Sequence, residues 1–123
     1  MNQSTIDRTF KLWDYHTSHN HLLLRSPKSP DSNHTPPANT NIDIRFFGVS
    51  YLNIPTLLRG CEIVEANVEK INTIDSLFPN RTAENKIFII VSAGSRYLVV
   101  AVGYEISEND LDIFQTILDR YNL

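Results

Sequence analysis

The chain has 123 residues, of which 41% are hydrophobic and 20% charged, and its formal net charge is −3 at pH 7. This size and composition predict a single globular domain that buries a core without metal or disulfide staples. The acidic balance argues against electrostatic binding to nucleic acid or to an anionic membrane surface, so we expect neither as a partner.

The single cysteine, Cys61, rules out an internal disulfide and fits a reducing cytosol. The first residues are polar and do not resemble a secretory signal. The longest apolar run, residues 87–91, is far shorter than a membrane span. We therefore expect a soluble cytoplasmic protein whose residues 1–8 form a frayed tail.

The N-terminal part predicts a β-hairpin followed by a long loop. Residues 10–18 are aromatic and favour a strand, His19 and Asn20 suit a chain reversal, and residues 21–25 form a second strand. Residues 26–41 then hold four of the six prolines and no aliphatic side chain larger than that of Ala38. We interpret this stretch as a flexible insertion, with a functional flap as the alternative.

The middle of the chain predicts two more strands. In residues 42–51, Ile42, Ile44 and Phe46 alternate with charged residues, a pattern typical of a half-buried strand. Residues 61–68 form another strand. Short helical turns are expected at residues 55–59, where a proline begins the segment and a glycine follows it, and at 73–78. Residues 80–85 are a polar connector.

Residues 86–104 predict the central hairpin of the sheet, because two runs rich in β-branched residues flank Gly94 and Ser95. A turn at these two residues places Val91 opposite Leu98 and Ile89 opposite Val100. Both faces of this hairpin are apolar, so both need to be covered.

The last segment predicts a helix from Ser107 to about Tyr121. Ser107 suits the N-cap, acidic residues follow in the first turn, and apolar residues recur at helical spacing. The predicted fold class is therefore α+β: one antiparallel sheet of about six strands with a C-terminal helix packed on one face. The second face would be covered by sheet curvature, by the short turns or by another copy of the chain.

A histidine cluster is the first candidate site. In an extended segment His19 and His21 share a face, and His16 can approach them across the reversal. Imidazoles are ligands of catalytic zinc, so the cluster is a candidate metal site, with Asp14 orienting His16. Solvated turn histidines are the ordinary alternative.

Aromatic residues are the second candidate. Trp13, Tyr15, Phe47 and Tyr51 supply more aromatic surface than one side of a small sheet needs. Core packing explains such residues in most proteins. Exposed together, they would form a protein-binding patch, since Trp and Tyr anchor interfaces.

Three other features are weaker candidates for a functional site. Cys61 could act as a nucleophile only with a base brought close, and a small buried side chain is the simpler interpretation. Residues 92–96 resemble a phosphate loop superficially but suit a hairpin tip better. Glu62, Glu65 and Glu69 form either a solvated sheet face or an acidic docking surface for a basic partner.

One stretch carries a family resemblance. Residues 42–54, an alternating strand that ends in Phe-Gly-Val before a short apolar turn, are similar to a pattern of small bacterial α+β proteins of the toxin-immunity type. This resemblance implies a protein that acts by binding and has no catalytic residues to carry over.

The sequence thus favours a non-catalytic protein-binding module without a cofactor, of the immunity type or a homodimerising domain. The alternative is a metal-dependent hydrolase or small-ligand-binding protein that uses His16, His19 and His21. A third hypothesis is a ligand-binding domain in which residues 26–41 close as a lid.

Overall fold

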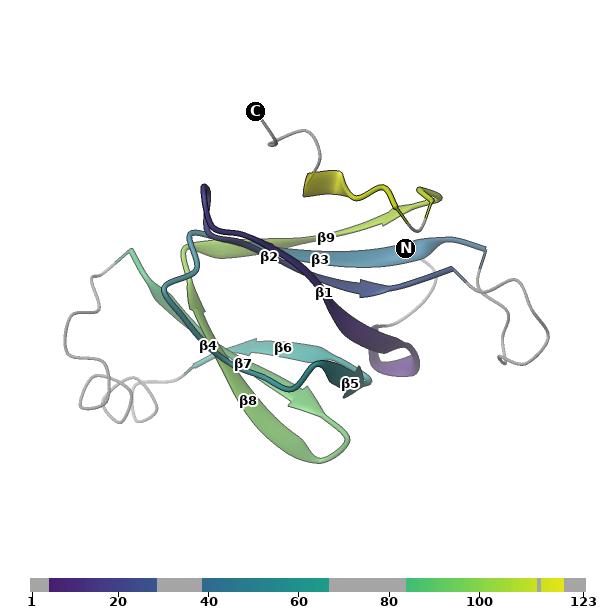
Figure 1. Ribbon diagram of the computed structural model, residues 1–123. Coiled ribbons are helices and arrows are strands. Elements are labelled where there is room, and N and C mark those ends of the chain that lie inside the picture. Colours follow the sequence, from purple (N-terminus) through teal and green to yellow (C-terminus); the bar gives the residue numbers. More distant parts are fainter. Residues whose placement is uncertain (1–4, 29–38, 67–83, 113, 119–123) are drawn as a thin grey trace.

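A computed structural model describes residues 5–28, 39–66, 84–112 and 114–118, and shows two antiparallel sheets packed face to face (Figure 1). The five-stranded sheet has the order β5 (Leu57–Arg59), β1 (Thr9–His16), β2 (His21–Ser26), β3 (Asn41–Phe47), β9 (Gly103–Asn109). The four-stranded sheet has the order β4 (Tyr51–Asn53), β8 (Ser95–Ala101), β7 (Lys86–Ser92), β6 (Glu62–Glu65). A short 3₁₀ helix, η1 (Thr5–Asp7), precedes β1.

The α+β prediction is wrong, and so is the single sheet of about six strands. Nine strands lie in two antiparallel sheets, and the described residues contain no helix of seven or more residues. No described helix is long and apolar enough to cross a membrane.

The predicted C-terminal helix is replaced by a strand and an irregular segment. Gly103–Asn109 continue from β8 as β9 and pair with β3 along its whole length, with Ser107 opposite Asp43. A ladder of seven paired residues outweighs the local helical pattern, because intrinsic helix propensity is a weak preference that tertiary pairing overrides. Residues 110–112 and 114–118, which we call the C-terminal segment, then lie over the outer face of the five-stranded sheet (Figure 1).

The central hairpin forms, but its turn is one residue earlier than predicted. Ala93 and Gly94 are the two turn residues, and both have positive φ, at 49° and 80°. Positive φ at both positions is the signature of a type I′ turn, which matches the twist of the flanking strands. The pairing is therefore Val91 with Arg96 and Ile89 with Leu98. The hairpin ends at Ala101, after which the chain bends at Val102 into the other sheet.

Four segments predicted from the sequence differ from the structure or lie wholly or mostly outside the described residues. Residues 57–59 form β5 where a helical turn was expected. The predicted turn at 73–78, most of the connector at 80–85 and most of the loop at 26–41 lie outside the described residues. The first hairpin is confirmed: β1 pairs with β2 around a turn at residues 17–20.

The two sheets share one core and are linked by bent chain segments. β3 continues into β4, β8 into β9, and β5 into β6, so each of these pairs contributes to both sheets. Side chains from both sheets meet in the core between them: Phe10, Leu22, Leu24, Ile42, Ile44, Phe46, Phe88, Ile90 and Val99. A second cluster, Ala66, Ile87, Ile89 and Val100, lies on the other face of the four-stranded sheet. Both faces of the central hairpin are thus apolar, as predicted.

Candidate functional site

The outer face of the five-stranded sheet carries a buried polar network that sequence analysis missed. The alternation at 42–46 predicted that Asp43 and Arg45 face solvent, but Asp43 is fully buried and Arg45 is 8% exposed. Arg25 donates two hydrogen bonds to Asp43, from Nε to Oδ1 at 2.7 Å and from Nη2 to Oδ2 at 3.0 Å. The half-buried strand prediction is wrong for β3, because the C-terminal segment covers this face.

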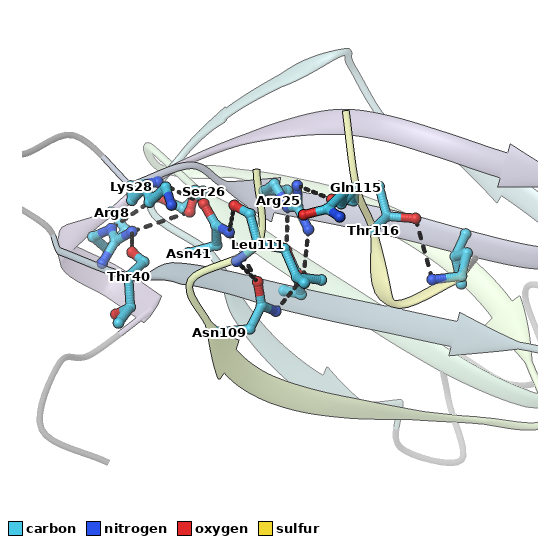
Figure 2. Close-up of polar contacts among 12 residues, drawn as sticks. Arg8, Arg25, Ser26, Lys28, Thr40, Asn41, Asn109, Leu111, Gln115 and Thr116 are labelled. Carbon is cyan, nitrogen blue, oxygen red and sulfur yellow. Dashed lines mark hydrogen bonds and ion pairs between the residues drawn. The ribbon is translucent and has the colours of Figure 1, made fainter. Parts of the chain in front are cut away.

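This network holds the C-terminal segment in place, as Figure 2 shows. Arg25 Nη1 donates to the carbonyl oxygen of Gln115 at 2.9 Å, and Asn41 Nδ2 donates to that of Leu111 at 3.0 Å. Asn109 Nδ2 donates to Asp43 Oδ2 at 2.7 Å. Leu118, at the end of the segment, is fully buried. These contacts give the buried charges a structural role, the attachment of the C-terminal segment to the sheet.

A second set of contacts joins the residues before β1 to the end of β2 and the start of β3. Arg8 is 7% exposed, and its Nη2 donates to the carbonyl oxygens of Ser26 at 3.0 Å and Thr40 at 2.9 Å. Its burial lowers the pKa of Arg8, while the charge of Glu108 acts in the opposite direction. Thr5 Oγ1 also donates to the carbonyl oxygen of Cys61. Residues 5–8, expected as part of a tail, are thus bound to the rest of the fold.

The three histidines lie close together but do not form a metal site. His16 Nε2 is 3.0 Å from Asp14 Oδ2, and the rings of His19 and His21 have their centroids 5.5 Å apart. His21 Nε2 lies 3.4 Å from Arg45 Nη1, and because a guanidinium can only donate, this nitrogen acts as the acceptor. The cationic Arg45 disfavours a metal cation at that nitrogen. Among the described residues no group of three or more His, Cys, Asp or Glu side chains could hold a metal ion.

The four candidate aromatic residues are distributed over three surfaces. Trp13 and Phe47 stack on arginines of the outer face, with Arg25 5.3 Å and Arg45 4.9 Å from the ring centroids. Tyr15 packs against the core between the sheets. Tyr51, 41% exposed, lies opposite Val100 on the other face of the four-stranded sheet. The structure therefore does not bring these four rings together.

Cys61 is buried, and burial raises the pKa of its thiol from 9.0 to about 12. A neutral thiol is a poor nucleophile, so this environment does not activate Cys61. It lines an open pocket of about 270 Å³ together with Ile6, Arg59, Gly60, Glu62, Val91 and Ala93.

Residues 92–96 form the hairpin tip, as expected, and lead into a strand. Glu62 and Glu65 are exposed on β6, and Glu69 lies outside the described residues.

The strongest candidate surface is the free edge of β9. Within the described residues β9 pairs only with β3, so its other edge has no strand beside it. Val102, Tyr104 and Ile106 alternate along this edge and are 41%, 36% and 40% exposed. The Tyr104 ring packs edge-on against Phe88, with centroids 5.2 Å apart, which fixes its position beside the core.

This surface was not predicted from the sequence, because the central hairpin was expected to end at residue 104 and a helix to begin at Ser107, which left no strand at 103–109. The strand could have been recognised in residues 102–107, where Val102, Tyr104 and Ile106 alternate with smaller or polar residues. Comparison with models of known protein families, with curated proteins and with solved structures finds no match.

Proposed function

We propose that this protein is a non-catalytic protein-binding module and that the free edge of β9 is its binding surface. The observation that carries this proposal is the row of exposed apolar side chains at Val102, Tyr104 and Ile106. Natural proteins usually keep edge strands short or protect them with charged side chains, especially lysine, or with proline, because an open edge is a template for pairing with another chain.

The other edge strands follow this rule, whereas β9 does not. β4 and β5 have three residues each and β6 has four, but β9 has seven. Its sequence, Gly-Tyr-Glu-Ile-Ser-Glu-Asn, contains neither lysine nor proline. A long edge with alternating apolar side chains suits strand addition, in which main-chain hydrogen bonds supply affinity and side chains supply specificity.

The sequence resemblance to toxin-immunity proteins implies a protein that acts by binding, and it does not identify the partner. A protein partner and a cytoplasmic location both stay predictions. The buried pair of Arg25 and Asp43 has a structural role on the outer face, since each charge is already satisfied by the other.

The test uses Ile106→Lys and a matched control, Val64→Lys. Val64 is 45% exposed on the edge strand β6, close to the 40% of Ile106. Wild type and both variants, each shown to be folded by circular dichroism, serve as immobilised bait in extracts of the source cells. We expect a bound protein whose recovery falls about tenfold with Ile106→Lys, which corresponds to about 1.4 kcal/mol, and is retained by Val64→Lys. Identical protein sets on all three baits would contradict the proposal.

A further inference from the structure

We infer that the occupant of the β9 edge is a second copy of this chain, with the two β9 strands paired antiparallel about a two-fold axis at Ile106. This inference rests on the proposed function and names the partner for the same surface. Such pairing joins two five-stranded sheets into one continuous sheet across the dimer.

The length of β9 determines where the axis lies. A two-fold contact uses the same patch on both copies, so the strand must be complementary to itself. Ile106 is the middle residue of Gly103–Asn109, and an axis there pairs all seven residues of the strand. Ile106 then lies opposite Ile106 of the second copy, so the centre of the contact is apolar.

The charges on β9 fit this register. With the axis at Ile106, Glu105 lies opposite Ser107 of the second copy, and Glu108 lies opposite Tyr104 of the second copy. No carboxylate directly faces another, and like charges directly opposite each other would destabilise a pair of strands. An axis one residue earlier, at Glu105, would place that carboxylate opposite itself.

The carboxylates of the edge are also held by groups of their own chain. Arg45 Nε donates to Glu105 Oε1 at 2.9 Å. Thr40 Oγ1 donates to Glu108 Oε2 at 3.0 Å, and the positive charge of Arg8 lies near enough to interact with Glu108. These contacts reduce the repulsion between two acidic strands, so a strand of the same sequence is an acceptable partner.

The same two-fold pairing would bury the exposed apolar side chains of β9. Tyr104 and Ile106 lie on the side of β9 that faces the core, because the Tyr104 ring contacts Phe46 and Phe88. A two-fold axis perpendicular to the sheet brings the equivalent side chains of the second copy to that same side. Partly exposed Ile106 would then be covered by its own counterpart.

A single introduced cysteine tests both the dimer and its register. Opposed residues of antiparallel strands have Cα atoms about 4.5–5.5 Å apart, within the range of about 4.4–6.8 Å that a disulfide spans. Ile106→Cys should therefore give a covalent dimer as the main species under mild oxidation. The native Cys61 is buried and does not compete. The matched control is Val64→Cys, on β6, which should form no covalent dimer at the same concentration because its cysteine lies away from the β9 contact.

Sedimentation equilibrium of the wild type provides the second measurement. At about 100 μM, where a dimer with micromolar dissociation constant is almost completely formed, we expect the mass of a dimer for wild type and of a monomer for Ile106→Lys. A monomeric wild type, or equal cross-linking of Ile106→Cys and Val64→Cys, would overturn this inference. A third outcome separates the two proposals: the wild type is monomeric but binds a different protein, and Ile106→Lys no longer binds it. This outcome would overturn the inference that the partner is a second copy and would leave the proposed function in place.

Discussion

Arg25 and Asp43 form a two-pronged ion pair across β2 and β3, and the side chains are only 1% and 0% exposed. The pair lies under the C-terminal segment, to which Arg25 also donates a hydrogen bond at the Gln115 carbonyl oxygen. A buried pair of this kind is costly to break, because the remaining charge has no water to replace its partner.

Asp43→Ala should therefore destabilise the protein by about 3–5 kcal/mol, since it leaves Arg25 buried without its carboxylate. The control is Glu105→Ala, which breaks the pair with Arg45 on a carboxylate whose side chain is 45% exposed, and should cost at most about 1 kcal/mol. Urea unfolding followed by circular dichroism measures both. A loss below about 1 kcal/mol for Asp43→Ala would show that the face opens to water.

The C-terminal segment should depend on one anchor residue. Leu118 is fully buried, whereas Phe114 is 90% exposed. Leu118→Ala should cost about 2–5 kcal/mol, as expected for a large side chain removed from a packed site. Phe114→Ala should change the free energy of unfolding by no more than about 0.5 kcal/mol. Urea unfolding of the two variants tests this, and equal effects would contradict the observed docking of the segment.

The type I′ turn of the central hairpin predicts a stabilising change. Ala93 has φ of 49°, in the left-handed region that Asn tolerates better than Ala. Ala93→Asn should raise the free energy of unfolding by about 0.5–1 kcal/mol. A turn at Gly94 and Ser95 would instead leave position 93 in a strand, where Asn is unfavourable, so a destabilised variant would argue for that register.

Two glycines with similar backbone conformations should respond differently to alanine. Gly60 and Gly94 have φ of 78° and 80°. A Cβ on Gly94 meets nothing within 4 Å, but on Gly60 it would lie 2.7 Å from the carbonyl oxygen of Ile6. Gly94→Ala should cost about 1–2 kcal/mol from backbone strain alone. Gly60→Ala should cost at least about 1 kcal/mol more, because backbone must move. Thermal unfolding of the two variants compares them, and equal costs would mean that η1 shifts freely.

The buried thiol predicts a dependence of stability on alkaline pH. Burial raises the pKa of Cys61 to about 12 from its ordinary 9.0, so between these pH values the unfolded chain loses a proton that the native state keeps. The raised pKa of the Cys61 thiol therefore contributes its full stabilisation below pH 9. As the pH rises from 9 towards about 12, the free energy of unfolding falls by up to about 1.4 kcal/mol per pH unit.

Urea unfolding of wild type and Cys61→Ala from pH 8 to about pH 11 separates this effect from the titration of tyrosine and lysine. Wild type should lose more stability than the variant over this range. Parallel curves for the two proteins would indicate that the thiol is accessible to solvent.

Local pattern was enough to predict several parts of this protein. The β-branched runs around Gly94 predicted the central hairpin and its two apolar faces, and the aromatic stretch before His19 predicted the first hairpin. These features depend on residues close together in the chain, where side-chain alternation and turn chemistry act directly.

Tertiary structure alone decided the rest. Residues 107–109 were expected to begin a helix with its N-cap at Ser107, yet they end β9 because β3 offers a complete pairing partner. Asp43 and Arg45 look like solvent-facing residues, but the C-terminal segment and complementary charges bury them. The free edge of β9 follows from the order of strands in the sheet. Long-range pairing and the partners of buried charges depend on residues far apart in the chain, and no local period of the sequence encodes them.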